Sequence, residues 1–307
     1  MNFEISTGPH IRAKDDAKSI MWWVAFALLF PSATAVYFFG ISALILIIFT
    51  TLIAVISEVF FQFVSKRPIT VPDGSAVVTG LLLALILPSG LPLWIAAIGS
   101  FFAIVIAKGL FGGLGFNIFN PALAARAFLV ASWPVAMTMW LKPFSAITGP
   151  TPLYLSKIGE AVPGYLDLFL GNRGGCLGET SVLAILIGSG ILFYKKIIDW
   201  PAPVAYIGTV FILSFLLGKD PVFHIMAGGL MLGAFFMATD YVTTPVTTKG
   251  RFIFGLGCGI MTVLIRFYGG FPEEVNYSIL LMNILTPVID KYARPRLFGA
   301  LTRSRVI

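Results

Sequence analysis

The chain has 307 residues, of which 58% are hydrophobic and only 11% charged, and its mean hydropathy is +0.93. This composition excludes an ordinary soluble globular protein and indicates an all-α polytopic membrane protein. The formal net charge of +7 does not indicate a partner such as nucleic acid, because the basic residues lie between apolar runs and at the chain ends.

Ten apolar runs are the predicted elements. A transmembrane helix needs about 20 mostly apolar residues, and the runs cover residues 21–39, 41–63, 75–89, 92–109, 119–139, 179–194, 201–217, 221–239, 252–269 and 275–290. Residues 1–20 mix acids and bases without a cleavage site, which predicts a cytoplasmic N-terminal segment. The predicted units are therefore this segment, membrane halves of five helices over 21–139 and 179–290, a loop over 140–178 and a basic tail over 291–307.

The basic residues predict the orientation of the chain. With the N-terminus in the cytoplasm, fifteen of the 21 lysines and arginines fall on the inner side and four on the outer side, while Arg126 and Arg266 lie within runs. Cytoplasmic connections carry such an excess, so we expect both termini inside and the 140–178 loop outside. Two halves of five helices have opposite orientations, which is the arrangement of inverted-repeat transporters; two unrelated halves are the alternative.

A polar stretch with the sequence FSAITGPTPL, residues 144–153, separates the two halves. It places the hydroxyls of Thr148 and Thr151 on either side of Gly149 and Pro150, in a turn-forming context. On the outer face, such hydroxyls are accessible to water, a cofactor or a modifying enzyme.

A second stretch, GGLGFNIFNPA over residues 112–122, combines glycines with Asn117 and Asn120. Asn120 followed by Pro121 predicts a helix start, with the asparagine as N-cap and the proline at the first helical position. Glycines permit close approach of a planar ligand, and amide side chains can bond the carbonyls and ring nitrogens of such a ligand. A tight turn and a capped membrane helix, without a ligand, are the alternative.

Charged residues inside the runs are candidates for buried pairs or for an ion path. A charge at the centre of a membrane helix costs about 2.5–3.5 kcal/mol on the insertion scale, so Arg126 and Arg266 each require an anionic partner, a water-filled cavity or a lipid headgroup. Glu58 and Glu179 are the predicted partners within the chain, and either could instead line an ion path.

Two further segments carry polar groups at the ends of runs. Asp240 begins a hydroxyl-rich loop, DYVTTPVTTKG, which predicts local bonds between side chains and backbone. The segment GETS over residues 178–181 predicts a helix start at the outer face. Its free backbone N–H groups could hold a phosphate, and simple capping is an equally good interpretation.

These motifs, taken together, resemble the RnfD and NqrB family of membrane subunits in redox-driven ion pumps. The resemblance rests on GPHIR at residues 8–12, the NIFNPA string, the threonine stretch, GETS and the DYVTTP string, in family order over nearly the whole chain. It implies that Thr151 carries FMN through a phosphoester. Thr148 and Gly149 match the attachment motif, whereas Ser145 replaces an acidic residue and Pro150 an alanine.

The resemblance also implies a second, non-covalent flavin, riboflavin, near Asn117 and Asn120, and a role for Asp240 near an internal cofactor or ion entry. A long soluble extension typical of NqrB is missing, which favours RnfD. The implied function is electron transfer between ferredoxin and NAD, coupled to outward transport of Na⁺ or H⁺ across the cytoplasmic membrane of a prokaryote.

Two cysteines and two histidines are too few for an iron–sulfur or haem site within the chain, so we expect an organic redox cofactor here and metal centres in the other Rnf subunits that are its partners. A flavin transferase is the expected modifying partner. Three alternatives stay open: membership of a NADH:quinone-type sodium pump, a regulatory relative that reduces another protein, and a flavin-free solute channel or transporter.

Overall fold

The computed structural model describes residues 16–145, 147–270 and 274–293, and the regular elements among them are all helices. Isolated β-bridges pair Pro88 with Cys176 and Leu141 with Thr148. The predicted helical class is thus confirmed. Most of the predicted N-terminal segment, and the basic tail from residue 294 onward, lie outside the described residues.

The first half of the chain contains the helices α1 (Ala17–Phe39), α2 (Ile41–Val64), η1 (Val71–Asp73), α3 (Ser75–Leu85), α4 (Leu93–Phe101), the π-helical η2 (Phe102–Gly109), α5 (Pro121–Ser132) and α6 (Pro134–Met137). α1 begins after Asp16, whose carboxylate accepts a hydrogen bond from Ser19 N–H at 2.7 Å, and it continues through Pro31. α5 begins at Pro121 with Asn120 as its cap, as the sequence predicts.

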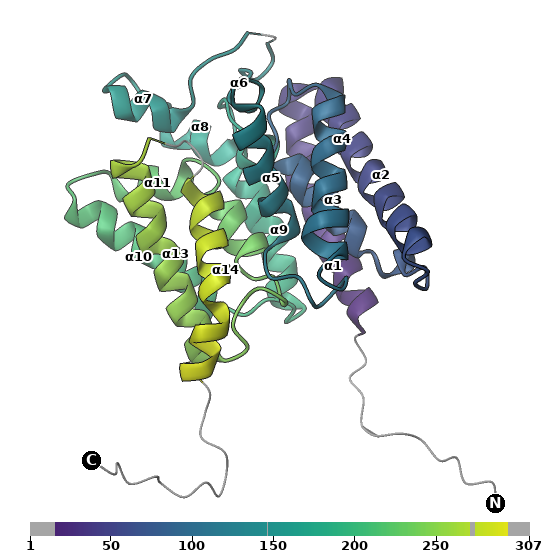
Figure 1. Cartoon of the computed structure of the whole chain (residues 1–307). Coiled ribbons are helices and arrows are strands. Elements are labelled where there is room, and N and C mark those ends of the chain that lie inside the picture. The colour runs from purple at the N-terminus through teal and green to yellow at the C-terminus, as the bar shows by residue number, and fades with distance from the viewer. Residues whose placement is uncertain (1–15, 146, 271–273, 294–307) are drawn as a thin grey trace, which may run out of the picture.

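The connecting loop carries the short helices α7 (Pro152–Ile158), α8 (Tyr165–Leu170) and η3 (Leu177–Glu179). The second half contains α9 (Val182–Tyr194), α10 (Pro201–Leu216), α11 (Pro221–Met226), α12 (Leu230–Leu232), the π-helical η4 (Gly233–Met237), α13 (Thr248–Tyr268) and α14 (Glu274–Ala293). In Figure 1, α1 begins and α14 ends at the same end of the bundle, while α7 lies at the opposite end.

Every predicted run coincides with helix, but helix length varies widely. Among the described helices, α1, α2 and α13 are long and apolar enough to cross a membrane by length and composition alone. Shorter apolar helices of 10–17 residues cover Ser75–Leu85, Leu93–Gly109, Pro121–Ser132, Val182–Tyr194 and Pro201–Leu216. A multi-pass membrane protein follows from these helices and from the apolar side chains on their outer faces, such as Tyr37 and Phe63, which are 70% and 78% exposed.

The run over 221–239 is not the continuous helix that the sequence suggests. It breaks at residues 227–229 between α11 and α12, where Gly228 has a φ of +69°, a left-handed conformation that glycine adopts without strain. The run over 75–89 likewise leaves helical geometry after Leu85, ahead of Pro88. Such irregular backbone at membrane depth is tolerated where protein covers it, and α3 and α12 both lie in the main apolar core.

The two halves pack around shared central helices. α2 contacts α4 in the first half, and α10 contacts α13 in the second. α1 packs against α9, and α5 packs against α14, so each half supplies two helices to the contact between halves. Cavities form at both ends of the bundle.

Candidate functional site

A cavity of about 930 Å³ lies beside the connecting loop at the α7 end of the bundle (Figure 1). Its walls include Trp140, Thr151, Lys157, Arg266 and Glu274. Small-molecule and cofactor sites occupy about 300–1,000 Å³. The cavity therefore has the volume of a cofactor site, and the side chains of a threonine, two bases and an acid face it.

Thr151 is fixed by the start of α7. Its Oγ1 accepts a hydrogen bond from Tyr154 N–H at 3.3 Å, the geometry of an N-cap, and its side chain is half-buried. Thr148 is exposed and pairs through its backbone with Leu141, while Gly149 N–H donates to Trp140 O at 2.9 Å. The structure thus directs Thr151 into the cavity and leaves Thr148 outside its lining.

The loop that carries Thr151 is anchored at two places. Phe144 N–H donates to Phe38 O at 2.9 Å, and the Phe144 ring packs on Tyr37 and Phe38 at the end of α1. On the other side of the cavity, Lys157 Nζ donates to Gly269 O at 2.8 Å and so ties α7 to the end of α13. Both anchors position the loop against the ends of membrane helices.

Buried charges lie directly below this loop. Arg126 of α5 pairs with Glu179 at 3.7 Å, and Arg266 of α13 pairs with Glu274 of α14 at 3.0 Å. Arg173, from the loop itself, is 4% exposed. Burial lowers the pKa of Arg173 to about 10, with Glu179 raising it and Arg266 lowering it further, so this guanidinium is cationic at neutral pH.

These charges stabilise the break in the 221–239 run. Arg173 Nη1 donates to Met226 O at 2.6 Å, and Arg266 Nη1 donates to His224 O at 2.5 Å, so both cations bind carbonyls at the end of α11. The carboxylate of Glu179 lies 3.0 Å from the position that a Cβ at Gly229 would take. Cations at a helix C-terminus and anions near an N-terminus are favourable, which accounts for an irregular segment among buried helices.

The start of α9 is capped by its own side chain. Ser181 Oγ accepts from Ala184 N–H at 3.2 Å, and a Cβ on Gly178 would lie 2.7 Å from Leu85 Cβ. The packing leaves little space in front of this helix, so the structure favours the capping interpretation of GETS over phosphate binding.

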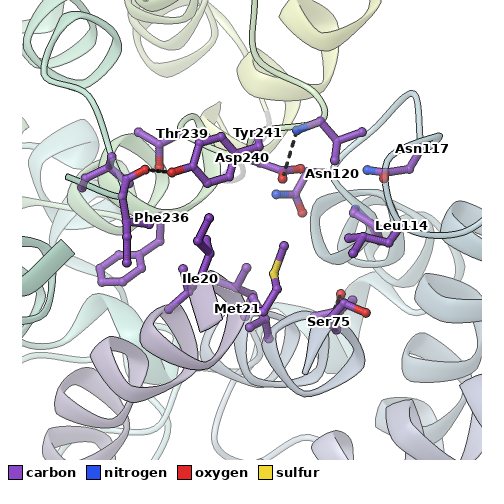
Figure 2. A pocket seen from close by; sticks show the side chains of 18 of the residues that line it. Ile20, Met21, Ser75, Leu114, Asn117, Asn120, Phe236, Thr239, Asp240 and Tyr241 are labelled. Carbon is purple, nitrogen blue, oxygen red and sulfur yellow. Dashed lines mark hydrogen bonds between the residues drawn. The ribbon is translucent and has the colours of Figure 1, made fainter. Parts of the chain in front are cut away.

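A smaller cavity, about 80 Å³, lies at the opposite end of the bundle. Figure 2 shows Asn120 and Asp240 directed toward the same space, with Met21 and Ser75 on the facing wall. Asn117 also lines it, so the structure brings Asp240 together with the two asparagines that the sequence singled out in another motif. Its volume is below the range of cofactor sites.

The polar groups of this inner cavity already have protein partners. Asn117 Nδ2 donates to Phe119 O at 2.9 Å, and Asn120 Oδ1 accepts from Ala122 N–H at 3.1 Å. Asp240 Oδ2 accepts from Thr243 Oγ1 at 3.1 Å, the local hydroxyl bonding that the sequence predicts for this loop. A flavin does not fit this cavity as it stands.

Glu58 does not pair with Arg126 or Arg266. Its carboxylate lies 2.6 Å from Nζ of Lys108, which comes from the π-helical η2 and also donates to Ser75 Oγ at 2.6 Å. Lys108 is 3% exposed, whereas the sequence placed it among the bases of the inner connections. The pair lies at the inner cavity, because Lys108 and Ser75 line its wall.

Sequence reasoning missed Lys108, Arg173 and Glu274. Lys108 and Glu274 lie at the ends of apolar runs, where a charge ordinarily faces water, and Arg173 lies in a polar loop. The available signal is that Glu273 and Glu274 are the acidic residues nearest to Arg266 in the sequence.

The helices, their apolar exterior and these buried ion pairs define a multi-pass membrane protein with a charged interior and a cofactor-sized cavity at one end. The chain belongs to the NQR2, RnfD, RnfE family, whose model matches residues 4–299, which confirms the family resemblance.

Similar proteins include the D subunit of the Na(+)-translocating ferredoxin:NAD(+) oxidoreductase complex of Acetobacterium woodii, 52% identical over 97% of this chain and 96% of the relative. The D subunit of the Proton-translocating ferredoxin:NAD(+) oxidoreductase complex of Clostridium ljungdahlii is 50% identical over the same shares. The D subunit of the Ion-translocating oxidoreductase complex of Stutzerimonas stutzeri is 40% identical over 93% of each chain.

Proposed function

We propose that this chain is the RnfD subunit of an Rnf-type electron-transport complex, which transfers electrons between ferredoxin and NAD and couples the transfer to translocation of Na⁺ or H⁺. Support comes from the family match and from relatives named for that function, which align over nearly their full length. The partners are the other subunits of the complex. The relative named for Na⁺ translocation and the relative named for proton translocation are almost equally similar to this chain. Overall sequence identity therefore does not decide which of the two ions is translocated.

The chain carries covalent FMN on Thr151. The observation that supports this best is the position of the Thr151 hydroxyl, at an N-cap on the wall of a cavity of about 930 Å³. Thr151 Oγ1 would displace a leaving group from the phosphorus of a flavin donor: the bond from phosphorus to the leaving oxygen breaks, and the hydroxyl proton goes to the leaving group. The net change is FMN plus threonine less one water, and a flavin transferase would be the enzyme. Bound there, FMN supplies single-electron transfer, while the protein supplies position and polarity.

The residues around Thr151 have separate tasks in this proposal. Thr148 and Gly149 form the turn that presents Thr151, and the Gly149 N–H bond to Trp140 O holds that turn in place. The pair of Arg266 with Glu274 forms part of the cavity wall and keeps its charges fixed by hydrogen bonds. Charged groups that are already oriented need little reorganisation when the charge of a bound cofactor changes.

The positions of the chain ends support an outer position for the cavity that Thr151 lines. The end of the bundle at which α1 begins and α14 ends is opposite to α7 (Figure 1). With the basic bias of the sequence, this predicts ten spans, both termini in the cytoplasm of a prokaryote and Thr151 on the outer face. The matching contacts of α2 with α4 and of α10 with α13 support two inverted five-helix repeats.

The inner cavity is the proposed position of the second site. Asn117, Asn120 and Asp240 line it, and the Glu58–Lys108 pair forms its charged edge. A non-covalent flavin at Asn117 and Asn120 requires this cavity, which is about 80 Å³ here, to widen. Asp240 and Glu58 are the acidic groups proposed for ion entry at this end, while Arg126 and Glu179 occupy the other end.

The attachment is tested by in-gel fluorescence of purified protein from cells that contain the flavin transferase. We expect a fluorescent band for wild type and for the control variant Ser156→Ala, which removes another hydroxyl from the wall of the same cavity, and none for Thr151→Ala. A band that persists in Thr151→Ala would assign the flavin to another residue, and a wild type without a band would overturn covalent attachment.

A further inference from the structure

His224 is a buried histidine with an unused ring nitrogen. It lies in α11 and is 4% exposed, and among the described residues its Nδ1 has no hydrogen-bond partner. Buried polar side chains are normally hydrogen-bonded, and leaving one unpaired destabilises the fold. A buried imidazole with a free nitrogen beside a cavity is therefore a group that a ligand can use.

The cavity beside His224 is the one that Thr151 lines. Both residues form part of the wall of the space of about 930 Å³ at the outer end of the bundle. They come from different parts of the chain, since Thr151 caps α7 and His224 lies in α11. A group attached to Thr151 therefore enters the space that His224 borders.

The position of the His224 side chain is fixed by its neighbours. The rings of Phe223 and Phe267 pack edge-on against the imidazole, with centroids 5.1 and 4.8 Å away. The backbone oxygen of His224 accepts a hydrogen bond from Arg266 Nη1 at 2.5 Å, and Asp220 caps the start of α11. The plane of the imidazole is thus set before a ligand binds, which lowers the cost of binding.

The charged groups near His224 are engaged with other partners. Arg266 donates to the carboxylate of Glu274 through Nε at 3.2 Å and Nη2 at 3.0 Å. The carboxylate of Asp220 accepts from backbone N–H groups of α11 and from the hydroxyl of Tyr165. The cavity is therefore the remaining source of a partner for the imidazole.

We propose that His224 donates a hydrogen bond to the isoalloxazine ring of the FMN attached to Thr151 and so tunes the redox potential of that flavin. This inference rests on the proposed function. The isoalloxazine carries carbonyl oxygens and ring nitrogens that accept hydrogen bonds, and an imidazole has an N–H donor in both of its protonation states. A half-turn about the Cβ–Cγ bond exchanges the two sides of the imidazole without changing its plane, so either nitrogen can serve.

The expected effect of this hydrogen bond has a definite sign. Reduction adds electron density to the flavin ring, so a donated hydrogen bond is stronger with the reduced ring than with the oxidised one. Hydrogen bonds to the ring are one of the means by which a protein tunes a cofactor. His224 should therefore favour the reduced form and raise the midpoint potential.

The test measures the midpoint potential of the attached flavin in the purified full-length chain, with Thr151→Ala as the blank for flavin bound elsewhere. His224→Phe keeps an aromatic ring but loses the donor. At a fixed potential it should lower the ratio of reduced to oxidised flavin about tenfold, which is about 30 mV for a two-electron couple. The control Asn172→Ala, at an exposed loop position outside the cavity lining, should keep the wild-type potential.

Two conservative variants separate a hydrogen bond from a packing effect. His224→Asn and His224→Gln place an amide N–H near Nδ1 and near Nε2, so one of them should restore the wild-type potential. A wild-type potential in His224→Phe, or no recovery in either amide variant, would overturn the contact.

Attachment is measured separately by in-gel fluorescence, so the two proposals fail in different ways. An attached flavin whose potential does not depend on His224 would overturn the hydrogen bond and leave covalent FMN in place. A wild type without attached flavin would overturn both.

A further measurement keeps His224 intact and covers the case in which its variants do not fold. The chain has two histidines, so in His10→Gln labelled with ¹⁵N-histidine the remaining imidazole resonances belong to His224. A ring nitrogen should shift when flavin is attached and shift again when that flavin is reduced. Ring resonances that stay unchanged in both steps would overturn the contact.

Discussion

The two ends of the bundle differ in how their buried charged side chains are paired. At the inner end, Glu58 and Lys108 form a balanced pair, 2.6 Å apart, beside a cavity of about 80 Å³. At the outer end, the ion pairs Arg126–Glu179 and Arg266–Glu274 lie beside a broken helix and adjoin a cavity of about 930 Å³. A cofactor-sized volume and several buried ion pairs thus occur together at the end that carries Thr151.

The largest expected effect comes from removing one partner of the balanced pair. Lys108→Met leaves the Glu58 carboxylate buried and unpaired, and breaking a buried pair costs about 3–5 kcal/mol. Arg126→Met should cost less, because the Glu179 carboxylate lies 3.7 Å from Arg126, is 15% exposed and keeps Arg173 as a neighbouring cation. Thermal unfolding of both variants checks the comparison, with the double variant Glu58→Gln, Lys108→Met as the control that should recover most of the loss. Equal losses in the two single variants would contradict the stronger dependence of Glu58 on a single partner.

The break in the 221–239 run gives the next largest effect. Gly228 has a φ of +69°, and a Cβ there would lie 2.7 Å from Leu153 and 3.1 Å from Glu274. Gly228→Ala should therefore destabilise the protein by about 1–3 kcal/mol, the range for a strained backbone position. Gly190→Ala is the matched control, since a Cβ at that helical position has no described neighbour within 4 Å. Denaturation in detergent should give a lower midpoint for Gly228→Ala than for Gly190→Ala. Equal midpoints would argue against a strained backbone at the break.

Asn120 tests whether the inner cavity holds a ligand. Asn120→Ala removes the N-cap of α5 and should cost about 1 kcal/mol. Asn120→Ser retains a capping oxygen and should keep most of the stability while losing the amide. If a non-covalent flavin binds there, both variants should release it, as measured by flavin in the supernatant after acid precipitation. Normal flavin content in Asn120→Ser would remove Asn120 from the site.

The smallest effect is expected at the surface of the inner end. Arg251 and Asp199 form an ion pair with side chains that are 22% and 56% exposed. Exposed pairs contribute about 0–1 kcal/mol, so Asp199→Asn should leave the unfolding temperature almost unchanged. A loss comparable with that of Lys108→Met would show that burial is not what separates the two kinds of pair.

Local patterns were predictable from the sequence, and distant pairings were not. The start of α5 at Asn120 and Pro121 depends on neighbouring residues, so the capping pattern identifies it. The partner of Glu58 is Lys108, on another helix, and sequence spacing carries no information about that contact.

The break at Gly228 was missed for a different reason. Small residues in an apolar run are also typical of closely packed continuous helices. The hydrogen bonds from Arg173 and Arg266 to the end of α11 distinguish a helix broken at Gly228 from a continuous one, and these contacts are visible only in the structure.

The most direct test of the account is mass spectrometry of the peptide that contains Thr151, from protein purified out of cells with the flavin transferase. We predict that this peptide carries the mass of FMN less one water and that fragmentation assigns the addition to Thr151. An unmodified Thr151 peptide, or a flavin assigned to Thr148, would contradict the outer cavity as the cofactor site.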